Sequence, residues 1–155
     1  MLSAWLHLLA LALYLGAVIG LWLVLLPSLS AIRSEEARLK RLARGLKFYN
    51  PLQIGALGVV VLTGAFQITD LKATYRGLFI QQFGATLAIK LTLSFVLIVL
   101  STYQAMGVAH RFVRRYEAGE SISATELDTI IRQLKFSAIA LLLLAVPTIW
   151  LGIRL

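Results

Sequence analysis

The stretch AWLHLLALALYLGAVIGLWLVLL, residues 4–26, decides the fold of this chain because no charged side chain interrupts it. Three more apolar stretches follow at residues 51–69, 84–108 and 136–153, and Lys90 is the only charged residue in them. A helix rises about 1.5 Å per residue, so about 20 apolar residues cross a hydrocarbon core about 30 Å thick. Lipid cannot satisfy backbone N–H and C=O groups, so each stretch is predicted to be a helix. The sequence therefore predicts an all-α integral membrane four-helix bundle.

The composition leaves room for a single domain. The four spans use most of the 155 residues, 59% of which are hydrophobic, so we expect one four-helix unit over residues 1–155. The chain contains no cysteine, which excludes disulfides, cysteine-bound iron–sulfur clusters and thiolate metal sites. The first span has no basic residue before it and Pro27 directly after it, so we expect a membrane helix rather than a cleaved signal peptide.

The basic residues predict the orientation of the bundle. Eleven of the fifteen Lys and Arg residues lie in segments 33–47 and 111–135, which follow the first and third spans. Basic loops stay in the cytoplasm, so we expect both segments inside and both termini outside. The formal net charge of +8 then reflects membrane topology rather than a nucleic-acid surface. The basic residues on the cytoplasmic side also suit anionic lipid headgroups. The predicted location is the plasma membrane, as in the inner membrane of a bacterium.

Helices are expected to extend from the membrane on the cytoplasmic side. Residues 34–46 have amphipathic helical spacing and either lie on the membrane surface or extend the second span. Pro51 suits the first turn of a helix, with Asn50 as its cap. Ser123 and Glu126 have the spacing of a capping box, so the fourth helix is expected to begin directly after Ser123.

Polar side chains within the spans are the candidates for chemistry, because polar groups in lipid are costly and face the bundle interior. On the predicted topology His7, Tyr14, Gln67 and Lys90 lie in the external half. We expect His7, Gln67 and Lys90 to line one cavity there. The polar residues near the cytoplasmic face are Gln53, Tyr103, Gln104 and His110.

His7 is the strongest candidate for a ligand. A neutral imidazole can bind haem iron or a copper ion, or donate a proton, and Tyr14 lies two turns further along the same helix face. The alternative is an interfacial histidine that contacts water. Lys90 must pair, lose its proton or extend to the headgroups, and its ammonium could bind a carboxylate such as a porphyrin propionate. Both interpretations of Lys90 stay open.

Met106 and His110, spaced i and i+4, form a weaker candidate site for a copper ion. Arg111, Arg114 and Arg115 follow His110 and oppose cation binding, so a surface histidine is favoured there. The four spans contain no carboxylate, which argues against a proton-coupled pump. The chain also has no nucleophile–base pair, nucleotide loop or zinc motif.

Three stretches of sequence carry a resemblance to a known group of proteins. They are LHLLALALYLG at residues 6–16, FYNP at residues 48–51 before a glycine-rich helix, and IKLT at residues 89–92. The turn AGES at residues 118–121 adds to them. On these residues the chain resembles the copper-resistance D (CopD) family and the related HemJ-type protoporphyrinogen oxidases. Tyr14 stands where CopD-like first helices usually have tryptophan.

The resemblance implies a four-helix membrane fold in which His7 and Lys90 are linked to haem or porphyrin. We therefore expect a small protein that binds haem b, with His7 as the axial metal ligand, Lys90 as a propionate partner, and Tyr14 and Gln67 beside them. HemJ-type chains have a Tyr-His pair past the lysine, where this chain has Ser101-Thr102. They also have an R-x-x-N-E motif where this chain has RQLK.

Several functions are compatible with this interpretation. The leading one is electron transfer, or a role as a subunit of a larger membrane complex such as a respiratory or photosynthetic assembly. The alternatives are a HemJ-type protoporphyrinogen oxidase, a copper-handling protein and a purely structural accessory subunit. A Soret band would indicate haem, metal analysis would separate copper from iron, and co-purification with a large complex would favour the accessory subunit.

Overall fold

Four long helical rods make up the computed structural model, which describes residues 2–154 and all of their side chains except those of residues 79 and 82. Each rod is long and apolar enough to cross a membrane. In chain order the elements are α1 (Leu2–Gly20), the π-helical η1 (Leu21–Leu25), α2 (Leu26–Ser30), α3 (Glu35–Tyr75), the 3-10 turn η2 (Arg76–Leu78), α4 (Phe79–Thr102), the π-helical η3 (Tyr103–His110), α5 (Arg111–Glu117) and α6 (Ala124–Ile153). The prediction of an all-α fold with four long helices is confirmed.

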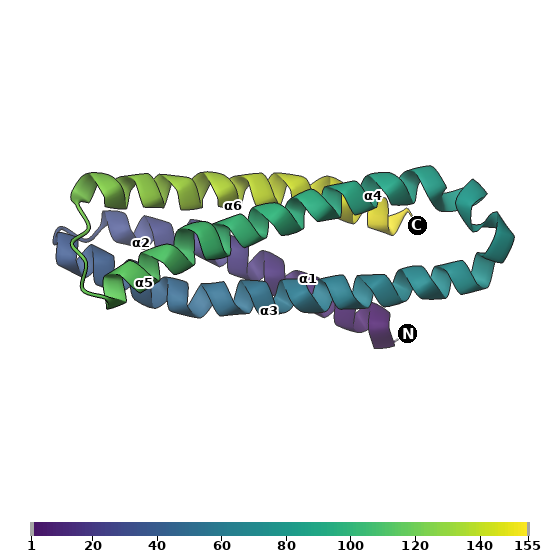
Figure 1. The fold of residues 1–155 in the computed structure, drawn as a ribbon, viewed down its shortest axis with the longest axis horizontal. Helices are drawn as coiled ribbons and strands as arrows, with labels where there is room; N and C mark the ends of the chain where they lie inside the picture. The colour runs from purple at the N-terminus through teal and green to yellow at the C-terminus, as the bar shows by residue number, and fades with distance from the viewer. Residues whose placement is uncertain (1, 155) are drawn as a thin grey trace.

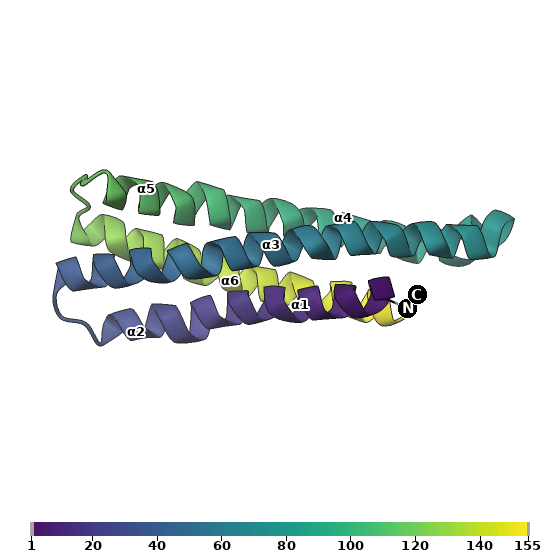
Figure 2. The ribbon, with the colours of Figure 1, turned by 90° about the horizontal axis from the view of Figure 1, so that it is seen from below.

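The rods lie side by side and alternate in direction. Both ends of the described chain lie at the same end of the molecule, and the turn between α3 and α4 projects beyond them (Figure 1 and Figure 2). The opposite end holds the α2–α3 and α5–α6 connections. Both basic segments, 33–47 and 111–135, therefore lie at that end, which we call the basic end.

The segment 34–46 extends the second span, because α3 is one continuous helix from Glu35 to Tyr75. Ser34 has an extended backbone, and its hydroxyl accepts a hydrogen bond from the Ala37 amide at 3.4 Å. The expectation that Pro51 opens a helix is wrong, since Pro51 lies inside α3. The Asn50 side chain does not cap a helix and instead donates to the Ala105 carbonyl oxygen at 3.1 Å.

Two π-helical segments interrupt the rods, and each has a local cause. Pro27 cannot donate a backbone hydrogen bond, and just before it the Leu26 amide donates to the Leu21 oxygen in the wider turn of η1. In η3 the Asn50 side chain occupies the Ala105 carbonyl, which competes with the ordinary helical ladder. Such π-bulges are frequent where a helix must present a side chain to a specific partner.

The core has two apolar clusters. One lies at the basic end and includes the fully buried Leu42, Leu127 and Leu134, so the helical extensions pack against one another. The other lies towards the middle of the rods, around Tyr14 and Val18. Many large apolar side chains face outward instead, including Leu62, Phe66, Phe95, Leu143 and Val146. Outward apolar faces of this extent fit a lipid environment.

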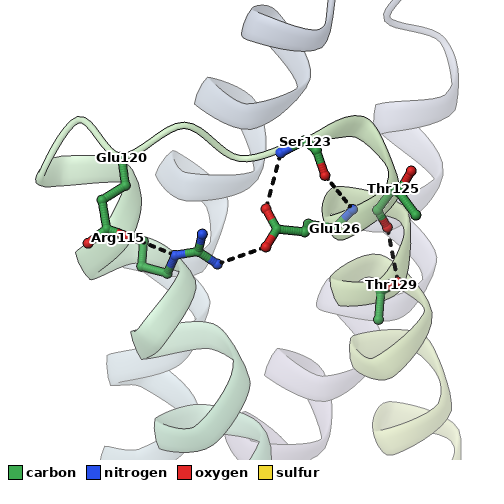
Figure 3. A network of polar contacts seen from close by, with 6 residues as sticks. All are labelled: Arg115, Glu120, Ser123, Thr125, Glu126 and Thr129. Carbon is green, nitrogen blue, oxygen red and sulfur yellow. Dashed lines mark hydrogen bonds and ion pairs between the residues drawn. The ribbon is translucent and has the colours of Figure 1, made fainter.

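Polar contacts close the turn between α5 and α6, as Figure 3 shows. The predicted capping box is confirmed, since the Ser123 amide donates to Glu126 Oε2 and the Glu126 amide donates to Ser123 Oγ, both at 3.2 Å. Arg115 lies between Glu120, at 2.9 Å, and Glu126, at 3.6 Å. Gly119 has a φ of 73°, a left-handed conformation that suits glycine after a helix.

Candidate functional site

The α1–α3 interface positions His7, the predicted ligand. His7 Nδ1 lies 2.8 Å from the Thr63 hydroxyl oxygen. That hydroxyl lies 2.6 Å from the Val59 carbonyl and, having one proton, donates it there. The Val60 carbonyl lies 3.2 Å from the same hydroxyl. A hydroxyl that donates its proton to Val59 offers a lone pair to the ring, which favours the tautomer with the N–H at Nδ1.

This arrangement favours one tautomer of a neutral His7. When Nδ1 carries the proton, Nε2 keeps its lone pair, and that is the form of imidazole that binds a metal ion. Gly64 lies beside the ring, where a methyl group would be 3.4 Å from His7 Cε1, an ordinary van der Waals contact. The His7 side chain is only partly buried, so the site lies near the surface of the bundle.

Lys90 lies at the same end of the bundle and packs against the last turn of α6. A methyl group at Gly152 would lie 3.2 Å from Lys90 Nζ. The final carbonyls of a helix carry partial negative charge, so the ammonium is stabilised there without an acidic partner. Lys90 is also close enough to His7 for their charges to interact. The two predicted site residues thus lie at the same end of the bundle.

The cavity predicted to join His7, Gln67 and Lys90 stays a prediction. An apolar groove of about 310 Å³ lies along α1 and α3 next to His7, between Leu6 and Leu13 on one side and Leu52 and Val59 on the other. None of the three predicted residues lines it. Gln67 is partly exposed and has no hydrogen-bond partner among residues 2–154. We therefore treat this groove separately from the His7 site.

Tyr14 is held in the core rather than at the His7 site. Its side chain is fully buried, and its hydroxyl forms a hydrogen bond with the Ser101 hydroxyl of α4. Ser101 is one of the residues that stand in place of the HemJ-type Tyr-His pair. Sequence analysis did not identify Ser101 as the partner of Tyr14, and only its place on a buried helix face could have indicated this.

A second polar cluster joins three rods deeper in the bundle. Gln53 Nε2 donates to Gln104 Oε1 at 3.0 Å. The Gln104 amide donates to Ser137 Oγ at 2.8 Å and to the Leu134 carbonyl at 3.2 Å. All four residues are buried. Side-chain hydrogen bonds of this kind link helices within membranes, so the cluster ties α3, η3 and α6 together.

Met106 and His110, the weaker copper candidate, lie on η3 at the basic end. Both side chains are exposed, and His110 has no hydrogen-bond partner in the described part of the chain. They are far along the bundle from His7, as expected from their places in the sequence. The two residues supply only two ligand atoms, and the arginines that follow His110 remain beside them.

Comparison with known proteins finds no matching family model, curated protein or solved structure. The resemblance to CopD and HemJ-type proteins therefore stays a prediction. The geometry places the His7 imidazole against Thr63 at the end of the bundle that holds both chain ends, the end where Lys90 also lies.

Proposed function

We propose that this chain is an integral membrane protein that binds haem, or a related porphyrin, through His7. The observation that carries the proposal is the hydrogen bond from His7 Nδ1 to Thr63, which orients the ring and leaves Nε2 as the donor atom. Ligating histidines in proteins are commonly fixed in this way by a partner on the other ring nitrogen. Lys90 would supply a positive charge for a propionate group.

The ligand atoms favour haem over a bare metal ion. Among residues 2–154 no group of three or more His, Cys, Asp or Glu side chains gathers to hold an ion. Haem brings four nitrogens of its own and needs one imidazole from the protein. When bound, its iron would supply one-electron chemistry, and the role we propose is electron transfer within a larger membrane complex. A copper-handling role or a HemJ-type oxidase is the less supported alternative.

The proposed membrane placement follows from charge. We place the basic end in the cytoplasm and the chain ends, with His7 and Lys90, near the external face of a plasma membrane. Both basic segments lie at one end of the bundle, which supports this placement. Lys90 then lies level with the end of α6, where its ammonium can reach the headgroups.

A structural accessory subunit is the second candidate, and one observation favours it. The deeply buried polar side chains Tyr14, Gln53, Ser101, Gln104 and Ser137 all have hydrogen-bond partners within the chain. They therefore serve packing and need no ligand. On this interpretation His7 and Lys90 would also be structural, and the protein would bind no haem.

The test is the absorption spectrum of protein purified after expression with ample haem. We expect a Soret band in the wild type, its loss in His7→Ala, and its retention in His110→Ala, a matched control at the opposite end. Thr63→Val keeps the size of the side chain but removes the partner of Nδ1, so haem affinity should fall about 10- to 100-fold. A wild type without a Soret band, or a His7→Ala variant that keeps it, would refute the proposal in favour of the accessory subunit.

A further inference from the structure

A hollow at the basic end combines positive charge with an apolar wall. It has a volume of about 150 Å³ and lies between α3 and the π-helical turn of the first rod. Arg41, Arg44 and Tyr49 of α3 line it on one side. Val24 and Leu25 of η1 line it on the other side.

The two arginines of this hollow lack acidic partners. Three other basic residues at this end are paired, Arg38 with Asp128, Lys47 with Glu117, and Arg115 with Glu120 and Glu126, while six more, like Arg41 and Arg44, form no ion pair among the described residues. Within residues 2–154 no acidic side chain forms an ion pair with Arg41 or Arg44, and both are exposed. They lie one helical turn apart, where like charges repel each other, so an anion between them would be favoured.

Tyr49 adds an unused hydrogen-bond donor to the hollow. Its ring lies so close to α1 that a methyl group at Gly20 would be 2.7 Å from Tyr49 Cε1. The ring is therefore held in place by the backbone opposite. Its hydroxyl has no hydrogen-bond partner in the described part of the chain. Two arginines and a tyrosine with an unused donor thus line one hollow beside an apolar wall.

The apolar groove lies further along the same α1–α3 seam as the hollow. Gly45, Leu52 and Gly55 follow at the spacing of one face of α3, and Leu52 and Gly55 line the groove. Ten residues separate Gly45 from Gly55, a rise of about 15 Å, which is shorter than an extended fatty-acyl chain. A charged hollow followed by an apolar track matches a molecule with an anionic head and a hydrocarbon tail.

We infer that this surface binds one anionic phospholipid of the cytoplasmic leaflet, with its phosphodiester on Arg41, Arg44 and Tyr49 and one acyl chain along the α1–α3 seam. Arginine suits this role because its planar donors match phosphate oxygens in pairs. The inference rests on the proposed membrane placement but is independent of haem. A free anion would gain nothing from the apolar track.

The test measures lipid binding to purified protein in neutral detergent at physiological salt, by native mass spectrometry. The probes are dioleoyl phosphatidylglycerol, dioleoyl phosphatidylcholine and inorganic phosphate. We expect phosphatidylglycerol to bind preferentially, and Arg41→Gln/Arg44→Gln to weaken that binding about 30-fold. Tyr49→Phe should weaken it a few-fold, because only one hydrogen bond is lost.

A matched control distinguishes binding at this hollow from general attraction of the lipid to the basic residues at this end. Lys40→Gln/Arg111→Gln removes the same charge at the same end from residues outside the hollow. Screening limits the reach of such charges, so binding should weaken less than about threefold. Equal losses in the two double variants, or equal binding of inorganic phosphate, would overturn the inference. Failure of the wild type to insert into phosphatidylcholine vesicles would instead refute the membrane placement.

Discussion

Replacing Gln104 tests whether the buried polar cluster holds the rods together. Gln104→Leu removes the acceptor of Gln53 and the donor to Ser137 and Leu134. Interhelical hydrogen bonds in membranes contribute on average about 0.6 kcal/mol each, so two side-chain pairs account for about 1 kcal/mol. The Gln53 amide, 2% exposed, would be left unpaired at a further cost of about 1–3 kcal/mol. We expect the free energy of unfolding to fall by about 2–4 kcal/mol.

The assay is reversible unfolding in mixed detergent micelles, followed by circular dichroism. Gln53→Leu/Gln104→Leu removes both amides, so it should destabilise the protein less than Gln104→Leu alone. Gln67→Leu is the matched control and should change stability by less than about 0.5 kcal/mol, because Gln67 is partly exposed and unpartnered within residues 2–154. If Gln104→Leu behaves like the control, or if the effect of the double variant equals the sum of the effects of Gln53→Leu and Gln104→Leu measured singly, the cluster does not stabilise the bundle.

Three further predictions concern topology and packing. A single cysteine at Ala73 should react with an impermeant thiol reagent from outside the cell, and one at Ala118 should not; the opposite labelling would reverse the orientation. Ser123→Ala should lower the free energy of unfolding by about 1 kcal/mol through loss of the cap, and unchanged thermal stability would contradict this. Gly45→Ala should destabilise by about 1–3 kcal/mol, because its methyl would lie 2.3 Å from a buried leucine methyl, whereas Gly55→Ala, with open space around it, should not.

Local signals in the sequence were enough to predict the rods. Uninterrupted apolar runs set the four spans, and the Ser123–Glu126 spacing set the start of α6. The error at Pro51 has a physical reason. Proline opens a helix readily in isolation, but the surrounding rods hold α3 straight through it, and the Asn50 side chain finds its partner on η3 instead.

The partners across the rods could not be predicted, because they depend on register. His7 of α1 contacts Thr63 of α3, and Leu25 of η1 lies against Gly45 of α3. In both pairs the two residue numbers have the same sum, so one register between the two antiparallel helices explains both contacts. The length and bend of the α2–α3 connection set this register, and no single residue in the sequence indicates them. Thr63 was therefore missed as a partner of His7. It also bonds its own helix, as threonines in membrane helices often do.

Polar side chains in the middle of the bundle have hydrogen-bond partners within the chain, whereas several at its two ends have none among residues 2–154. In the middle, Tyr14 and the Gln104 cluster use their hydrogen-bonding capacity within the chain, so they explain stability and leave nothing for a ligand. At one end His7 Nε2 has no hydrogen-bond partner among the described residues. At the other, Arg41 and Arg44 keep their charge without an acidic partner among the described residues. Ligands of two kinds are therefore expected at opposite faces of the membrane, and because the rods between them are tied by separate contacts, loss of one should leave the other bound.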